Sequence, residues 1–346
     1  MRRVRALALL LIAIALPLFS QQVPLVQLIS HSTARLEWDP YRQQGDIADG
    51  TNVLSFRLGS PLFLLNHSET KSLGEVGFPN GQLVVSAEAA EYISALFSVG
   101  GNSAGQGLVP QRHVSTIFLD PGHGGRDPGA ISTQSINGKQ VLIEEKDVVL
   151  RVSKMVFAEL AAHYPDRKIA ISRNTDTYLP LEARTETANA IPRKPNDSTV
   201  FVSIHANASL RKATRGFEVW FLPPEYRRTL LEPSDVSQSS ADVLPILNSM
   251  LEEEYTIESV LLAKSILGGI DEEVGTLSPR LGLKENPWAV VRNAKMPSVL
   301  VEIGFITNPI EGPRLNDDVY LRKIAMGIYN GVVRYVTAYE HSNSPE

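Results

Sequence analysis

The chain has 346 residues, 43% of them hydrophobic and 21% charged, a composition typical of an ordinary globular protein with room for about two domains. The net charge of -5 argues against a nucleic-acid-binding protein, which normally carries a basic excess. Because the chain has no cysteine, it can form neither a disulfide nor a thiolate metal site, and its stability must come from its core, from a metal or from both.

Residues 1–20 differ in character from the rest of the chain. Three arginines precede an uninterrupted apolar run over residues 6–15, and small and apolar residues continue to Ser20. This order is typical of a secretory signal peptide. An uncleaved membrane anchor is the alternative, but Pro17 and an apolar core shorter than the roughly 20 residues of a spanning helix favour export. We expect a mature chain without a stable membrane span, in the periplasm or cell envelope.

The next segment, residues 21–98, has mostly β signals. Apolar and polar residues alternate from Ala34 to Trp38 and again from Val53 to Leu58, and Ser86 is placed to cap a short helix. We predict a small β-rich accessory domain here. Residues 99–112 are rich in glycine and small polar residues, which cannot build a core, so we predict a flexible linker.

From residue 113 the pattern changes to strands that alternate with helices. We predict a strand ending at Asp120, helices over about 145–163, 181–190 and 319–336, and further strands over 168–173, 200–204, 217–221 and 297–302. This alternation predicts an α/β fold with a mostly parallel or mixed central sheet, covered by helices on both faces, over residues 113–340.

A long interruption at about residues 223–275 separates two of these strands. It begins with two prolines, its second half has a helical pattern, and it carries the acidic run Glu252, Glu253 and Glu254. The segment is too long to be a plain loop. A helical insertion beside a site often acts as a lid, which is what we predict.

Two histidines follow strands and are candidates for one metal site. His123 lies in a Gly-His-Gly-Gly turn at the end of the strand that reaches Asp120, and His205 directly follows the strand 200–204. Without cysteine, a hydrolytic zinc site takes about three nitrogen or carboxylate ligands and keeps one position for water. Glu144 or Glu145, at the start of the first helix, supplies a third ligand.

Glu302 is a further candidate, because it closes an apolar strand. A charge in such a position is costly unless it is paired, which favours a functional role over a decorative one.

Six short motifs occur in the order found in one family, the zinc-dependent N-acetylmuramoyl-L-alanine amidases of type 3. The resemblance extends from about residue 115 to 336. The motifs are Leu119 to Ala130, Glu145 to Asp147, Ser172 to Thr175 with Arg184 and Asn189, Ser203 to Asn207, Gly216 to Glu218, and Pro297 to Asn308.

The resemblance implies an enzyme that acts on peptidoglycan and cleaves the amide between N-acetylmuramic acid and L-alanine of the stem peptide. It also implies zinc held by His123, Glu145 and His205, with Glu302 as the catalytic glutamate. Zinc lowers the pKa of bound water, and Glu302 takes the proton of that water and then delivers it to the departing amine.

Four residues near these motifs have open roles. Asp127, Arg184, Asn207 and Glu218 orient ligands or contact substrate, or else cap helices and form surface pairs.

In family members used for cell separation, an inserted helix covers the zinc until a partner removes it. By this resemblance we hypothesise that Glu252, Glu253 or Glu254 reaches the open position of the metal until an activator protein displaces the segment. A solvated acidic face is the alternative.

Two other functions remain open at this stage. One is a non-catalytic or regulatory wall-binding protein with the same fold, and the other is a zinc hydrolase of a different amide.

Overall fold

The computed structural model describes residues 22–30, 32–39, 43–49, 51–66, 69–97, 113–193, 197–226, 228–232 and 244–341. The predicted signal peptide and linker lie outside these residues. Within the described part of the chain, no helix has the combination of length and apolarity needed to cross a bilayer. The chain separates into two compact units, residues 1–66 with 70–109 and residues 67–69 with 110–346. The domain boundaries that we placed from the sequence remain predictions.

The N-terminal unit is β-rich, as expected. Its sheet has five strands in the order β2 (Arg35–Asp39), β3 (Gln44–Ala48), β4 (Val53–Arg57), β5 (Leu62–Leu65) and β6 (Glu69–Ser72). A second, two-stranded sheet pairs β1 (Val23–Pro24) with β7 (Val84–Val85), and the helices are α1 (Leu25–Ile29) and α2 (Ala87–Leu96). The side chain of Ser86 accepts a hydrogen bond from the Ala89 amide, which confirms the predicted helix cap.

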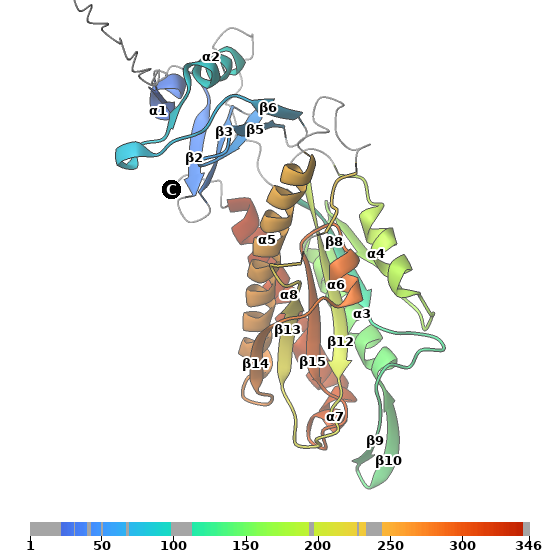
Figure 1. Cartoon of the computed structure of the whole chain (residues 1–346). Coiled ribbons are helices and arrows are strands. Elements are labelled where there is room, and N and C mark those ends of the chain that lie inside the picture. Colours follow the sequence, from blue (N-terminus) through green and yellow to red (C-terminus); the bar gives the residue numbers. More distant parts are fainter. Residues whose placement is uncertain are drawn as a thin grey trace, which may run out of the picture. The chain divides into compact units, whose positions relative to one another are not determined.

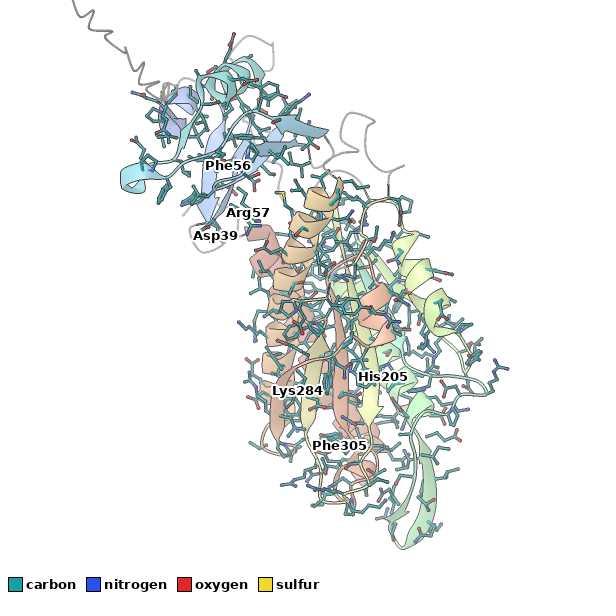
Figure 2. The ribbon with its side chains drawn as sticks, viewed as in Figure 1. Asp39, Phe56, Arg57, His205, Lys284 and Phe305 are labelled. Carbon is teal, nitrogen blue, oxygen red and sulfur yellow. The ribbon has the colours of Figure 1, made fainter. Side chains whose placement is uncertain are left out.

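The C-terminal unit is built on a mixed six-stranded sheet (Figure 1). The strand order is β11 (Lys168–Ile171), β8 (His113–Pro121), β12 (Asp197–Asn207), β15 (Ser298–Phe305), β13 (Phe217–Phe221) and β14 (Arg280–Glu285). The first four strands run parallel, whereas β13 is antiparallel to β15. His205 and Phe305 therefore lie at the same end of the sheet, the carboxyl end of β12 and β15 (Figure 2).

Helices cover both faces of this sheet, as predicted. One face packs on α3 (Glu145–His163), α5 (Leu244–Val274) and α8 (Asp318–His341), and the other on α4 (Leu181–Asn189) and α6 (Ala289–Asn293). Successive strand residues point to opposite faces. In β12, Val200, Val202 and Ile204 belong to the larger core, so Phe201 and His205 face the side of α4 and α6.

The sequence did not reveal several elements. A hairpin of β9 (Ile131–Ile136) and β10 (Lys139–Glu144) leads into α3 and turns at Asn137 and Gly138, both with positive φ. An Asn-Gly turn between two strands is a known hairpin signal, and Asn137-Gly138 carries it. The short helices α6 and α7 (Glu311–Leu315) and the edge strand β14 were also missed.

The lid that we predicted over about residues 223–275 is wrong for the part from about residue 260 onward. Residues 244–274 form one helix, α5, whose second half belongs to the main core through buried Leu262, Ile266 and Ile270. These residues pack on the sheet and on α8, so this half is part of the helical layer and does not cover the site.

Helices α5 and α8 approach each other closely because glycines face each other. A methyl group at Gly269 would lie 2.2 Å from the carbonyl oxygen of Gly327, while one at the neighbouring Gly268 would come no closer than 3.5 Å to the side chain of Arg334. Backbone atoms cannot move aside as a flexible side chain can, so the two positions differ in the space they offer.

We expect Gly269→Ala to lower the free energy of unfolding by about 1–3 kcal/mol through overpacking. Gly268→Ala is the matched control and should be neutral or stabilising, because alanine favours helix by roughly 1 kcal/mol. Denaturant unfolding of both variants checks this, and equal stability of the two would contradict the close helix crossing.

Candidate metal centre

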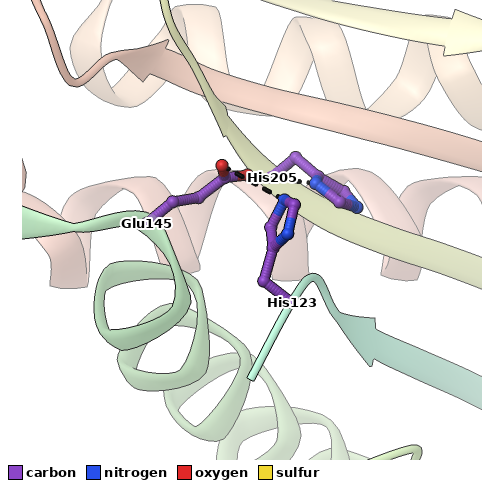
Figure 3. A group of neighbouring side chains, drawn as sticks. All are labelled: His123, Glu145 and His205. Carbon is purple, nitrogen blue, oxygen red and sulfur yellow. Dashed lines mark hydrogen bonds and ion pairs between the residues drawn. The ribbon is translucent and has the colours of Figure 1, made fainter. Parts of the chain in front are cut away.

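Three side chains meet at the carboxyl ends of β8 and β12 (Figure 3). They come from the turn after β8 (His123), the first residue of α3 (Glu145) and the end of β12 (His205). One ligand atom from each lies within 4.8 Å of the others, and they are the one such group of metal-binding side chains among the described residues. His123 Nε2 lies 3.2 Å from Glu145 Oε2, and His205 Nδ1 lies 3.0 Å from Glu145 Oε1.

The backbone brings the two histidines together because β8 and β12 are parallel neighbours. The amide of Gly122 donates to the carbonyl of Ile204 at 3.0 Å, which joins the turn to β12 just before His205. His123 has a φ of 58°, a left-handed conformation that is uncommon outside glycine. Two buried arginines hold this turn: Arg173 donates to the Gly122 carbonyl at 2.6 Å, and Arg184 to the His123 carbonyl at 2.5 Å.

In each histidine, the ring nitrogen that faces away from the centre also has a hydrogen-bond partner. His123 Nδ1 lies 2.9 Å from Asp127 Oδ2, and a carboxylate only accepts, so Nδ1 carries the proton and leaves Nε2 for a metal. Ser203 donates to Asp120 at 2.9 Å, so its oxygen accepts from His205 Nε2 at 3.2 Å. Nδ1 of His205 then faces the centre. Such outer contacts set the tautomer of metal-binding histidines.

The charges inside the group stabilise each other. Burial raises the pKa of Glu145, but hydrogen bonds and charge from His123 and His205 outweigh burial and hold its pKa well below the usual range. Burial lowers the pKa of His123, but Glu145 and Asp127 outweigh it, so that this pKa lies above its usual value. Without a metal, the carboxylate therefore favours the protonated ring of His123, and a cation between the three side chains can take over that role.

Two glycines, Gly122 and Gly129, leave room for the side chains of His205 and Glu145. A methyl group at Gly122 would lie 2.3 Å from the ring of His205, and one at Gly129 would lie 2.5 Å from Glu145 Oε2. No larger residue fits at either position without displacing a candidate ligand.

Glu302 lies in β15 directly beside His205 in β12, and on its other side it faces Glu218 in β13. Its Oε2 atom is buried, and no described residue hydrogen-bonds to it. Burial first, and then the charges of Glu145 and Glu218, raise the pKa of Glu302 well above its usual value. The predicted proximity of this carboxylate to the histidines agrees with the geometry.

The residues with open roles surround this group at different distances. Asp127 contacts His123, while Asn207 donates to Glu218 at 2.9 Å. Arg184 reaches the group only indirectly, through Asp120 and the backbone of the turn. Glu144 lies outside the group and pairs with Lys146 at 3.4 Å, so the geometry distinguishes it from Glu145.

Three supporting residues lie in the motifs quoted from the sequence, but no role was predicted for them: Asp120, Arg173 and Ser203. Asp120 is a lone charge at the end of an apolar strand, which is the same signal that drew attention to Glu302.

The structure contradicts the expectation that the acidic run reaches the centre. Glu252 is fully buried and pairs with Arg228 at 2.8 Å. The amide of Ser298, at the beginning of β15, donates to Ser259 of α5 at 2.9 Å. Residues 252–254 precede Ser259 by more than one helical turn and lie beyond the beginning of β15, whereas Glu302 and His205 lie toward the other end. The carboxylate of Glu252 is neutralised there by an arginine.

The fold and this group define an α/β protein with a mixed sheet and a His, Glu, His site suited to a metal ion at the carboxyl ends of parallel strands. The sequence pattern of one family, described as N-acetylmuramoyl-L-alanine amidase, matches residues 117–334. The chain belongs to this family.

Relatives with this name come from several bacteria. Amidase AmiC of Neisseria meningitidis is 32% identical over 247 residues, which cover 67% of this chain and 55% of AmiC. Amidase AmiA of Salmonella typhimurium is 32% identical over 63% of this chain and 75% of its own length. The chain thus spans about half of some relatives, such as AmiC, and three quarters of others. The solved structure of amidase AmiC2 of Nostoc punctiforme covers 64% of this chain and 97% of its own, at 27% identity and a TM-score of 0.47.

We expect Gly122→Ala to weaken metal binding by about 10–100-fold, as loss of a supporting contact around a ligand typically does, because its methyl group displaces His205. Competition with a chelator of known affinity measures this effect. Gly268→Ala, remote from the group, is the control. Unchanged metal affinity in Gly122→Ala, with an intact fold, would show that His205 is not held against this backbone.

Proposed function

We propose that this chain hydrolyses the amide between N-acetylmuramic acid and L-alanine in peptidoglycan, after export to the cell envelope. The observation that carries the proposal is the convergence of His123, Glu145 and His205, with Glu302 beside His205. The family to which the chain belongs and the names of its relatives support the same reaction.

Zinc fits the donor set of this group. The two inner ring nitrogens and one carboxylate are nitrogen and oxygen ligands, and the outer contacts with Asp127 and Ser203 hold both rings in the required tautomer. When bound, zinc supplies a water of lowered pKa and polarises the scissile carbonyl. His123, Glu145 and His205 would hold it.

Glu302 would act as the general base and acid. It lies beside His205, has a buried oxygen without a described partner and has a raised pKa, which suits a group that first accepts a proton and then releases it. In the reaction, Glu302 takes a proton from the attacking water. It then gives that proton to the amide nitrogen as the bond to the carbonyl carbon breaks, and L-alanine departs as a free amine.

Digestion of purified peptidoglycan, followed by mass spectrometry, tests the reaction. We expect stem peptides with a free L-alanine amino terminus and glycan strands that retain the lactyl group. Cuts between amino acids alone would favour a zinc hydrolase of another amide, and binding without any product would favour a wall-binding protein.

In the same assay, Glu302→Gln should lower the turnover of peptidoglycan by about 10²–10⁴-fold, because the amide cannot accept the proton of the attacking water. Zinc binding of this variant should persist, since Glu302 is not one of the three proposed ligands. Turnover at the wild-type rate would eliminate Glu302 as the base.

Zinc should stabilise the wild-type chain and should not stabilise His205→Ala to the same extent. At a free zinc concentration 100 times the dissociation constant, ligand binding adds about 2.7 kcal/mol to the free energy of unfolding. Thermal unfolding with zinc and with a chelator measures the difference. His163→Ala is the control, because His163 contacts Tyr329 away from the group. An equal zinc effect in both variants would argue against His205 as a ligand.

A further inference from the structure

Two tryptophans lie together on the face of the sheet that carries Glu302. Trp220 belongs to β13 and is partly buried against the smaller core, while Trp288 immediately precedes α6 and is 43% exposed. Their ring centroids are 5.8 Å apart, and the rings meet edge to face. This is a favourable aromatic geometry, so Trp220 holds the exposed ring of Trp288 in place.

One hydrogen bond connects this pair to Glu218, which lies beside the candidate site. The indole of Trp220 donates to Glu218 at 3.2 Å, and Glu218 faces Glu302 across β13 and β15. Trp220 and Glu218 are two residues apart on one strand, roughly 7 Å, and so point to the same face. Trp220 therefore lies next to Glu218, the last residue in the row of His205, Glu302 and Glu218 across the sheet.

The sheet edge beyond Glu218 is open. Glu218 is paired with Gly282 of the edge strand β14, and a methyl group placed on Gly282 would meet no atom within 4 Å. Lys284, the next residue of β14 on that face, is paired with Trp220 and is exposed; it lies on β14 across β13 and β15 from His205 (Figure 2). A ligand at the site can thus extend past Glu218 and over Gly282 without a steric clash.

The opposite flank has a different chemistry. After His123, the exposed guanidinium of Arg126 lies 4.3 Å from the ring centroid of Tyr178. That flank offers a cation to a carboxylate of the stem peptide. The tryptophan flank instead offers an exposed aromatic ring beside Glu218 and Lys284. A sugar fits it, because its C–H face stacks on an aromatic ring and its hydroxyl groups donate to a carboxylate.

We infer that Trp288, held by Trp220, is the stacking platform for a sugar ring of the glycan strand, which places the glycan over β13 and β14 and the stem peptide toward Arg126. This inference rests on the proposed function. It assigns Trp288 to substrate binding and not to the chemical step.

A tetrasaccharide of N-acetylglucosamine is the direct probe, because it is uncharged, contains no amide to a stem peptide and is not turned over. Its binding can be followed by calorimetry and by tryptophan fluorescence. We expect Trp288→Ala to weaken binding about tenfold and Trp288→Phe to retain part of it, because phenylalanine keeps an aromatic face for stacking. Leu261→Ala, an exposed residue of α5 on the other face, is the control.

Turnover gives a second readout. Trp288→Ala should lower kcat/KM on peptidoglycan about tenfold, mainly through KM, with zinc binding unchanged, because the contact is made equally in ground state and transition state. Equal tetrasaccharide affinity in wild type and Trp288→Ala would overturn the platform. So would Trp288-dependent binding of a sugar-free stem peptide, which would place the peptide on this flank.

The two proposals can fail separately. Trp288-dependent tetrasaccharide binding by a chain that releases no L-alanine terminus would support the platform and refute the proposed reaction. If the expected product forms and KM is the same in wild type and Trp288→Ala, the reaction is supported and the platform is refuted.

Discussion

The candidate centre depends on one buried carboxylate, Asp120, at the end of β8. It is fully buried and receives hydrogen bonds from Ser172, Ser203 and Arg184. Through Ser203 it fixes which nitrogen of His205 faces the centre, and through Arg184 it supports the carbonyl of His123. Since a buried ion pair gains little net stability against its desolvation cost, we attribute its value here to orientation: it couples the two histidines to one anchor.

The mixed strand order has a comparable effect on the other side of the centre. Because β13 runs antiparallel to β15, Glu218 faces Glu302. The next residue on that face, Trp220, is paired with Leu300 and so lies farther from the metal ligands. A purely parallel arrangement would bring the end of β13 to the centre and its loops with it. The reversal instead leaves a flat flank beside the site, with the sheet edge at Gly282 open.

Strand ends were the part of the site that the sequence could reveal. His123 and His205 follow apolar runs at the carboxyl ends of neighbouring strands, which the fold brings together. Glu302, which we expected to close its strand, lies within β15 beside His205. The family resemblance separated Glu145 from Glu144; spacing could not, because adjacent residues at a helix start differ only in the direction of their side chains. The acidic run was misplaced because its partner, Arg228, lies 24 residues from Glu252 and its pairing is a tertiary contact. Helical periodicity shows that α5 is a helix but not which end of the sheet its acidic turn meets.

Unfavourable local features are concentrated around the same centre. His123 adopts a left-handed conformation, Gly122 has no room for a side chain, and Glu302 keeps a buried oxygen without a described partner. Each of these costs folding free energy, and each persists because the surrounding structure over-determines it. Arg173 and Arg184 hold the turn by donating to its backbone carbonyls, and the layer of α3, α5 and α8 packs against the strands. A smaller apolar residue at position 302 would remove the buried carboxyl group, so a sequence chosen only for stability would not combine these features. Their combination around one centre is what marks these residues as a candidate site.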